Sequence, residues 1–242
     1  MRTLLPALAS VAAALAGPAA AADDDIERTW KFTAGQYRYH DGDGNGHDAN
    51  LRWQRDDTHA WAGLYEDRQV GTQFRGGVDG SWEPVAGVSL QPSLQAASGG
   101  FLGGSAMLQF GPEHWYGQVG WGRTNLKPYF NLNFDPNDAV TLGAGWRGEG
   151  GRLVSTTWIA DDRLHTGQRH WHVTARWPLR EHERLTLDVL RKRGQGDDGF
   201  VRAWGWTVTY DAPAGWFVRC ARDPKQNFSD QDALRLSLGT RW

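Results

Sequence analysis

The sequence has a single cysteine, Cys220, among its 242 residues. One cysteine cannot form a disulfide within the chain, so internal cross-links cannot stabilise the fold. A chain of this length must then be held together by an apolar core, a closed sheet or a membrane.

Long apolar runs and an excess of charge are also lacking. Beyond the first 21 residues no apolar run approaches the roughly 18 residues that a transmembrane helix needs, which excludes a helical membrane protein. The 26 Lys and Arg residues nearly balance the 28 Asp and Glu residues. This balance gives no reason to expect a nucleic-acid partner.

The N-terminal segment is typical of a secretory signal peptide. Arg2 is followed by an apolar run, which Pro18 interrupts and which ends in small residues at Ala21. We therefore expect residues 1–21 to be removed on export and residues 22–242 to form one domain.

Tryptophan and glycine, by contrast, are abundant, with 14 Trp and 31 Gly. Apolar and polar residues alternate along the chain, as in "AVTLGAGWR" (139–147) and "HWHVTARWP" (170–178), and helical three-and-four spacing is missing. The sequence predicts an all-β protein in which one face of each strand is apolar and rich in tryptophan.

Turn-forming segments divide the chain into about 14 strands, with 12 also possible. Short turns alternate with connections expected to be longer, which are residues 40–50, 66–71, 97–104, 124–138, 161–169, 193–199 and 223–232. Strands of about ten residues with this alternation and an outward apolar face are typical of bacterial outer-membrane barrels. We predict a transmembrane antiparallel up-and-down β-barrel that contacts outer-membrane lipid.

The tryptophans support this interpretation because most lie near predicted strand ends, as two aromatic girdles require. One set, which includes Trp30, Trp61, Trp146 and Trp177, lies near the short turns. A soluble secreted β-sandwich is the alternative, but it would bury its aromatic face in a finite core.

The last strand, "LRLSLGTRW", alternates from Leu234 and ends on Trp242. It resembles the C-terminal signature of outer-membrane barrels that their assembly machinery recognises. The resemblance implies that this machinery is a partner and that Trp242 is part of the signal.

The stretch "HDGDGNGHDAN", residues 40–50, has aspartates spaced like the start of an EF-hand calcium loop. The twelfth position, which should be Glu, is Arg52, and the flanks alternate as strands rather than helices. We interpret the stretch as an outward loop, with weak cation binding of another kind as the alternative.

His170 and His172 lie two apart on a predicted strand and share a face, as two metal ligands could. Asp161 or Asp162 could complete such a site, but wall histidines in a polar lumen are more common. No histidine has serine two residues later, the spacing that lipid hydrolases of this class place on one strand. We predict no metal, cofactor or catalytic residue, although a triad drawn from distant strands stays open.

The polar face is rich in arginine. It supplies the predicted lumen and solute-binding residues Arg52, Arg75, Asp79, Arg147, His170, His172, Arg176, Arg219 and Arg235, together with Arg184, Arg241, Glu66 and Asp188. Such arginines could pair with carboxylates and only hold the wall together. They could equally form a positive track for anionic solutes.

The longest connection, Thr124 to Asp138, carries Tyr129, Phe130 and Phe134. About 14 strands leave either a narrow pore or a lumen closed by a folded loop, and we interpret this aromatic segment as a constriction.

The overall plan resembles small monomeric bacterial outer-membrane barrels, including oligosaccharide-specific porins with arginine-lined lumens. The segment "FTAGQYRYHDGDGNGHDANL" is similar to the start of YaiO-type barrels. The resemblance implies a narrow diffusion channel for small polar or anionic solutes and no enzymatic activity. A lipid-modifying enzyme and a structural or surface-interaction barrel are the alternatives.

Overall fold

The computed structural model describes residues 29–40, 44–131 and 138–242. The predicted signal peptide lies outside these residues. In the described part of the chain, no helix is long and apolar enough to cross a membrane.

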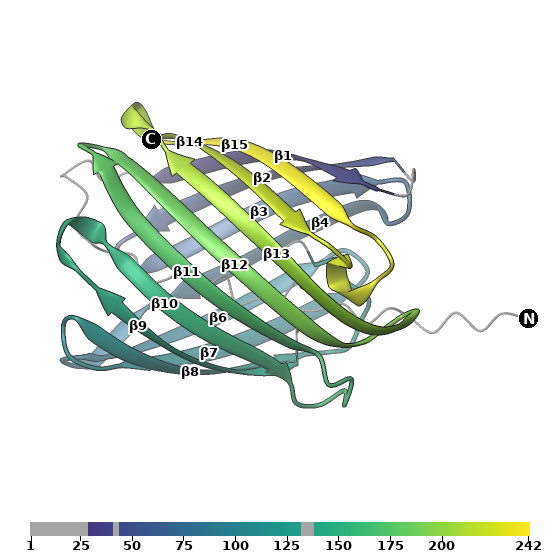
Figure 1. Cartoon of the computed structure of the whole chain (residues 1–242), viewed down its shortest axis with the longest axis horizontal. Helices are drawn as coiled ribbons and strands as arrows, with labels where there is room; N and C mark the ends of the chain where they lie inside the picture. Colours follow the sequence, from purple (N-terminus) through teal and green to yellow (C-terminus); the bar gives the residue numbers. More distant parts are fainter. Residues whose placement is uncertain (1–28, 41–43, 132–137) are drawn as a thin grey trace, which may run out of the picture.

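Fourteen antiparallel strands close into a barrel, and one additional short strand pairs with a single barrel strand (Figure 1). The strands are β1 (Trp30–Tyr39), β2 (Asn45–Arg55), β3 (Thr58–Asp67), β4 (Gly71–Gly80), β5 (Trp82–Val85), β6 (Val88–Ala97), β7 (Phe101–Phe110), β8 (Trp115–Thr124), β9 (Ala139–Arg147), β10 (Leu153–Asp161), β11 (Arg169–Arg180), β12 (Glu183–Gly196), β13 (Gly199–Asp211), β14 (Trp216–Asp223) and β15 (Ala233–Arg241). Three 3₁₀ turns lie between strands: η1 (Glu149–Gly151), η2 (Pro213–Gly215) and η3 (Gln226–Phe228). The predicted all-β, up-and-down barrel is confirmed.

Each barrel strand pairs with its neighbours in the chain, and two pairings complete the ring. β4 pairs directly with β6, so β5 pairs with β6 alone. β1 pairs with β15, and the backbones of Trp30 and Trp242 exchange hydrogen bonds of 2.9 and 3.0 Å. Closure therefore pairs the sheet edges that an open sheet would expose.

Side chains alternate between lipid-facing and lumen-facing positions because successive residues of a strand point to opposite faces. On β11, Trp171, Val173 and Trp177 are exposed, whereas His170 is fully buried. The same parity leaves a leucine, phenylalanine or tryptophan exposed on most strands. A continuous apolar outer surface of this kind is stable only against lipid.

Trp30, near the start of the described chain, lies beside Trp242 at the same end of the barrel as the short turns. The three longest connections, residues 125–138, 162–168 and 224–232, lie at the other end, and the last of these is the yellow segment at the right of Figure 1. By the rule for outer-membrane barrels, the end with the longer connections faces the cell exterior.

Four of the connections predicted to be long are short. Residues 68–70, 98–100 and 197–198 are tight turns, because the strands on both sides stay paired almost to the turn, as in Gly196 with Gly199. The stretch 40–50 is likewise only partly a connection, since β2 begins at Asn45. Residues 41–43 lie outside the described part.

Two side chains face the opposite way from the prediction. Glu66 is exposed on the outer face, because its neighbour Tyr65 is fully buried in the lumen. Trp61 has the same parity as Tyr65 and contacts Gly77 on the inner face, so it does not join the aromatic girdle. In both cases the alternation within β3 is too weak to show which side chains face the lumen, and the pairing of β3 with β2 decides it.

Leu142 and Thr141 test the assignment of lipid-facing and lumen-facing positions. Leu142 is 51% exposed, and its neighbour in register is Trp158, whereas Thr141 points inward. Leu142→Arg should destabilise the folded barrel by roughly 2 to 4 kcal/mol in bilayers, because charge is placed in lipid. Thr141→Arg should cost much less. Equal losses of unfolding free energy, measured by denaturant titration in vesicles, would contradict the assigned faces.

Candidate functional site: a charged lumen and an inward-folded loop

The lumen contains arginines of two kinds, and the first kind is paired with carboxylates. Arg52 Nη2 donates to Asp79 Oδ1 at 2.5 Å, and the other Asp79 oxygen lies 2.8 Å from Nδ1 of His59. Arg75 Nη2 lies 3.8 Å from an Asp48 oxygen, and both side chains are largely buried. These pairs join strands β2, β3 and β4 and stabilise the wall.

A third carboxylate holds two guanidinium groups on the opposite side of the β1–β15 pair. Asp211 of β13 accepts from Arg241 Nη1 at 2.8 Å and from Arg184 Nε at 3.2 Å. Arg235 donates to the hydroxyl of Tyr37 at 3.3 Å. The lumen wall is therefore cross-linked by charge-assisted hydrogen bonds at several points around the ring.

The second kind of cation has no carboxylate partner. Arg147 donates to Gln109 Oε1 at 2.6 Å and Arg219 donates to Thr209 Oγ1 at 3.2 Å, both neutral acceptors. Within the described residues, no ion pair is formed by Lys31, Arg147, Arg176 or Arg219. The lumen toward the short turns thus carries a surplus of positive charge.

Several lumen residues were not predicted from the sequence. Asp48 lies in the stretch interpreted as a loop, and Lys31 and Asp211 were not singled out. Lys192 is almost fully buried and donates to Asp223 at 2.6 Å. The inward positions of Lys31, Lys192 and Asp211 could have been found from strand parity, since Lys31, for example, alternates with the exposed Trp30 and Phe32.

The two histidines of β11 both face the lumen, but neither meets a set of metal ligands. His172 Nδ1 lies 2.8 Å from Asp188, and the His170 ring stacks on Phe228 at 5.3 Å. Asp161 accepts hydrogen bonds from backbone N–H groups of residues 163, 164 and 166, so it shapes a turn. Among the described residues, no three His, Cys, Asp or Glu side chains are placed to hold a metal.

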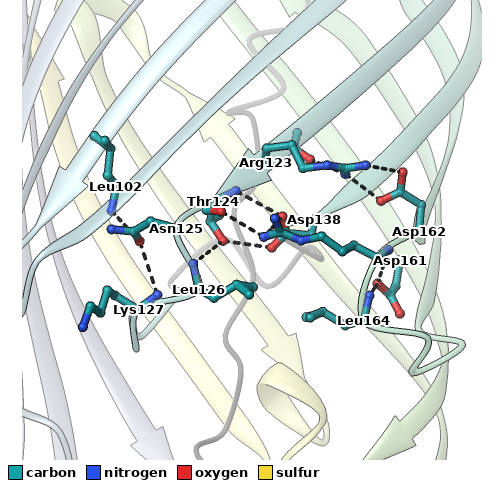
Figure 2. A network of polar contacts seen from close by, with 12 residues as sticks. Leu102, Arg123, Thr124, Asn125, Leu126, Lys127, Asp138, Asp161, Asp162 and Leu164 are labelled. Carbon is teal, nitrogen blue, oxygen red and sulfur yellow. Dashed lines mark hydrogen bonds and ion pairs between the residues drawn. The ribbon is translucent and has the colours of Figure 1, made fainter.

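The long connection between β8 and β9 is fastened at its base by Asp138. This buried carboxylate accepts from the backbone N–H of Thr124 at 3.1 Å and from its hydroxyl at 2.8 Å (Figure 2). Arg163 forms an ion pair with Asp138 at 2.6 Å and donates to the Thr124 carbonyl at 2.9 Å. The two ends of the connection are therefore held together by one buried carboxylate and one arginine.

The middle of the same connection packs on the inner wall at strands β3, β4 and β7. Phe130 stacks on Tyr65 at 4.7 Å, and Tyr129 stacks on Phe101 at 4.3 Å. The Phe130 N–H donates to Gln73 Oε1 at 2.8 Å, and Gln73 Nε2 donates back to the Phe130 carbonyl at 2.9 Å. Because Tyr65, Gln73 and Phe101 all face the lumen, Tyr129 and Phe130 lie inside the barrel.

The inward loop also meets η3 between β14 and β15. Asn227 Nδ2 donates to the carbonyl of Asn131, which is fully buried. Phe228 of the same turn packs against His170. Two connections thus meet inside the long-connection end of the lumen. Phe134, the third aromatic residue of the predicted constriction, lies outside the described residues.

No family model matches the chain, and no curated protein matches it in sequence. Solved structures do match. Outer membrane protein Omp33 of Acinetobacter baumannii has a TM-score of 0.59 at 9% identity, over 89% of this chain and 98% of that one. The KdgM porin has a TM-score of 0.50 at 7% identity, over 88% of this chain and 99% of that one.

The chain has the fold of small outer-membrane porins. The likeness covers most of this chain and nearly the whole length of both solved structures. At these identities it establishes the architecture and not the solute.

The inward loop of this porin fold can be tested by hydrogen exchange. Gln73→Ala removes both hydrogen bonds to the Phe130 backbone, so amide exchange across residues 129–131 should rise about tenfold or more, because an unmet buried hydrogen bond costs roughly 1–3 kcal/mol. Gln109→Ala is the matched control, since Gln109 is about as buried and its side chain accepts a hydrogen bond from Arg147 instead of holding the loop. Unchanged exchange in the first variant would show that Gln73 does not hold the loop.

The outer rim offers a test by pH. Arg123 donates two hydrogen bonds to Asp162, at 2.6 and 2.8 Å, and they hold the pKa of this carboxyl below its usual value (Figure 2). A depressed folded pKa contributes stability that is present above the unfolded value near 3.8 and is lost as pH falls through the folded pKa. Asp162→Asn should therefore lower the unfolding temperature slightly at pH 7, and this effect should shrink as the pH falls below 3.8. A difference that stays undiminished down to pH 2 would mean that the ion pair is not the cause.

Proposed function

We propose that the protein is a narrow outer-membrane diffusion channel for small anionic solutes. The observation that carries the proposal is the set of four lumen cations without carboxylate partners: Lys31, Arg147, Arg176 and Arg219. The sequence predicted two alternative roles for the lumen arginines, which were to hold the barrel wall together or to attract anionic solutes. These two roles then belong to different arginines. Arg52 and Arg75 serve the wall, while the unpaired cations serve the solute.

Buried charge supports this division. A cation in a lumen with low-dielectric walls is costly without a counter-charge, and structural arginines normally lie beside carboxylates. Cations that lack one attract mobile anions, which screen them and pass along the lumen. Guanidinium groups also present planar donors that match carboxylate and phosphate groups.

The barrel size and the inward loop support a narrow passage. Eight-stranded barrels are filled by side chains and 16-stranded porins leave a wide aqueous channel, so 14 strands lie between these cases. Tyr129 and Phe130 cross part of that space from the exterior end. We propose that they form a constriction that a solute must pass before it reaches the cations.

The porin fold of the neighbours favours transport over the other two functions predicted from the sequence. One is named a porin and the other an outer membrane protein, and neither name describes an enzyme. A barrel with this architecture resides in the bacterial outer membrane, where a passive channel needs neither cofactor nor catalytic group.

Ion selectivity tests the proposal. The triple variant Arg147→Gln, Arg176→Gln and Arg219→Gln should lower the anion-to-cation permeability ratio severalfold, because fixed charges in a narrow lumen are poorly screened. The measurement is the reversal potential of single channels in a salt gradient. The variant should still fold, because none of these three arginines forms an ion pair with a carboxylate in the described part of the chain.

The matched control removes the same charge from outside the lumen, with Arg38→Gln, Arg55→Gln and Arg180→Gln, all exposed. It should leave the reversal potential unchanged. Absence of conductance in the wild-type protein would contradict the channel, and an unchanged selectivity in the lumen variant would contradict the anion track.

A further inference from the structure

Four arginines project outward from neighbouring strands near the exterior end of the barrel. Arg169 of β11 is in register with Arg193 of β12, which is in register with Arg202 of β13. Arg191 lies two residues from Arg193 and shares its face. All four side chains are exposed, so they form a basic patch on the membrane-facing surface.

This basic patch is electrostatically unbalanced. Like charges directly opposite on adjacent strands repel, and here three arginines face one another across three strands. Within the part of the chain that the structure describes, none of the four forms an ion pair. Arg123 shows the contrast, because it points outward at the same end and has a bidentate partner in Asp162.

Aromatic residues border the patch on its membrane side. Trp171 and Trp204 are the register neighbours of Arg191, and the Arg191 guanidinium lies 5.5 Å from the Trp204 ring centroid. Trp158 is in register with Trp171. On β11 and β13 the arginine lies two residues closer to the exterior than the tryptophan. Exposed tryptophans mark the membrane interface, so the arginines lie at the level of lipid headgroups.

The basic patch also contains a pocket. A pocket of 230 Å³ is lined by Trp158, Trp171 and three of the arginines, Arg169, Arg191 and Arg193, with His170 in the same wall. The lining thus combines two tryptophan side chains with three arginine side chains. This combination fits an amphiphile with an anionic head and an apolar body.

Arginines also project outward from β1, β8 and β14, but two of them, Arg123 and Arg222, pair with aspartates. Among the described strands, only in this sector are outward arginines in register with one another. At the corresponding outward positions of β2, β3 and β4, the chain has His47, Glu66 and Thr72. A general preference for basic residues at the membrane surface would distribute them around the rim. The clustering instead favours one binding site.

We propose that the basic patch binds a phosphate-bearing lipid of the outer leaflet. Its phosphate would accept hydrogen bonds from Arg169, Arg193 and Arg202, and its acyl chains would lie along Trp158 and Trp171. The bound phosphate neutralises the repulsion between the arginines, and charge-assisted bonds to guanidinium are strong beside a low-dielectric membrane. The site lies on the outer face and does not involve the lumen cations.

Native mass spectrometry of the detergent-refolded protein tests this site. The probe is lipid A, a glycolipid with two phosphates, compared with its monophosphorylated form and with inorganic pyrophosphate. The wild-type protein should retain lipid A, retain the monophosphorylated form less, and bind pyrophosphate much more weakly because it lacks acyl chains. Equal binding of pyrophosphate and lipid A would overturn a lipid site in favour of a free-anion site.

The triple variant Arg169→Gln, Arg193→Gln and Arg202→Gln should lose lipid A affinity by about tenfold or more for each strong contact removed. If it does not refold, Arg193→Gln alone should still show a loss of about tenfold. The control with Arg38, Arg55 and Arg180 changed to Gln should bind like the wild type. Equal retention by the wild type and the patch variants would overturn the proposal.

The conductance of the same variants separates this inference from the proposed channel. The patch variants should keep the wild-type reversal potential, because their arginines face lipid. Loss of lipid binding with unchanged conductance supports the patch, whatever the wild-type selectivity proves to be.

Discussion

The structure depends on one constraint, which is that every backbone N–H and C=O group within the membrane must find a partner in the protein. A strand cannot satisfy these groups by itself, so the sheet has to close. The exchange of hydrogen bonds between Trp30 and Trp242 and the direct pairing of β4 with β6 meet this requirement. The short strand β5 can remain outside the ring because it lies in a connection between two barrel strands.

Closure turns the two-residue period of each strand into a division between lipid and lumen. The same strand β12 places Lys192 in the lumen, bonded to Asp223, and Arg191 and Arg193 on the outer face. Neighbouring cations therefore work in different surroundings. Inside, the energetics of a cation depend on nearby carboxylates, whereas outside we propose that they depend on lipid headgroups.

Within the lumen, some arginines pair with carboxylates and others meet only neutral acceptors. Arg52 and Asp79 belong to strands two apart in the ring, so their ion pair stabilises β3 between them. Arg147 and Arg219 instead meet an amide and a hydroxyl, which fix their orientation without cancelling their charge. Orientation with retained charge is the arrangement that an anion pathway requires.

Strand parity explains why much of this protein could be predicted from its sequence. Alternation in segments such as 139–147 and 170–178 predicts strand, and tryptophan on one face predicts lipid on that side. The inward positions of Arg52, Arg75, Arg147, Arg176, Arg219 and Arg235 follow from the same rule. The residues 1–21 as a signal peptide, the role of Trp242 in assembly and the likeness to YaiO-type barrels stay predictions.

Long-range contacts could not be predicted in this way, because local pattern does not report which strands meet or where a loop goes. Gln73 holds the backbone of Phe130 from 57 residues away, and Asp48 lies in a segment whose composition suggested a turn. Trp61 and Glu66 faced the opposite way because pairing with β2 overrides a weak local alternation. The sequence by itself determined a closed barrel with a basic interior, since both depend on a period of two residues. Only the tertiary structure decided which arginines have carboxylate partners, which stand together facing lipid, and that the longest loop folds inward, because these depend on register between distant strands.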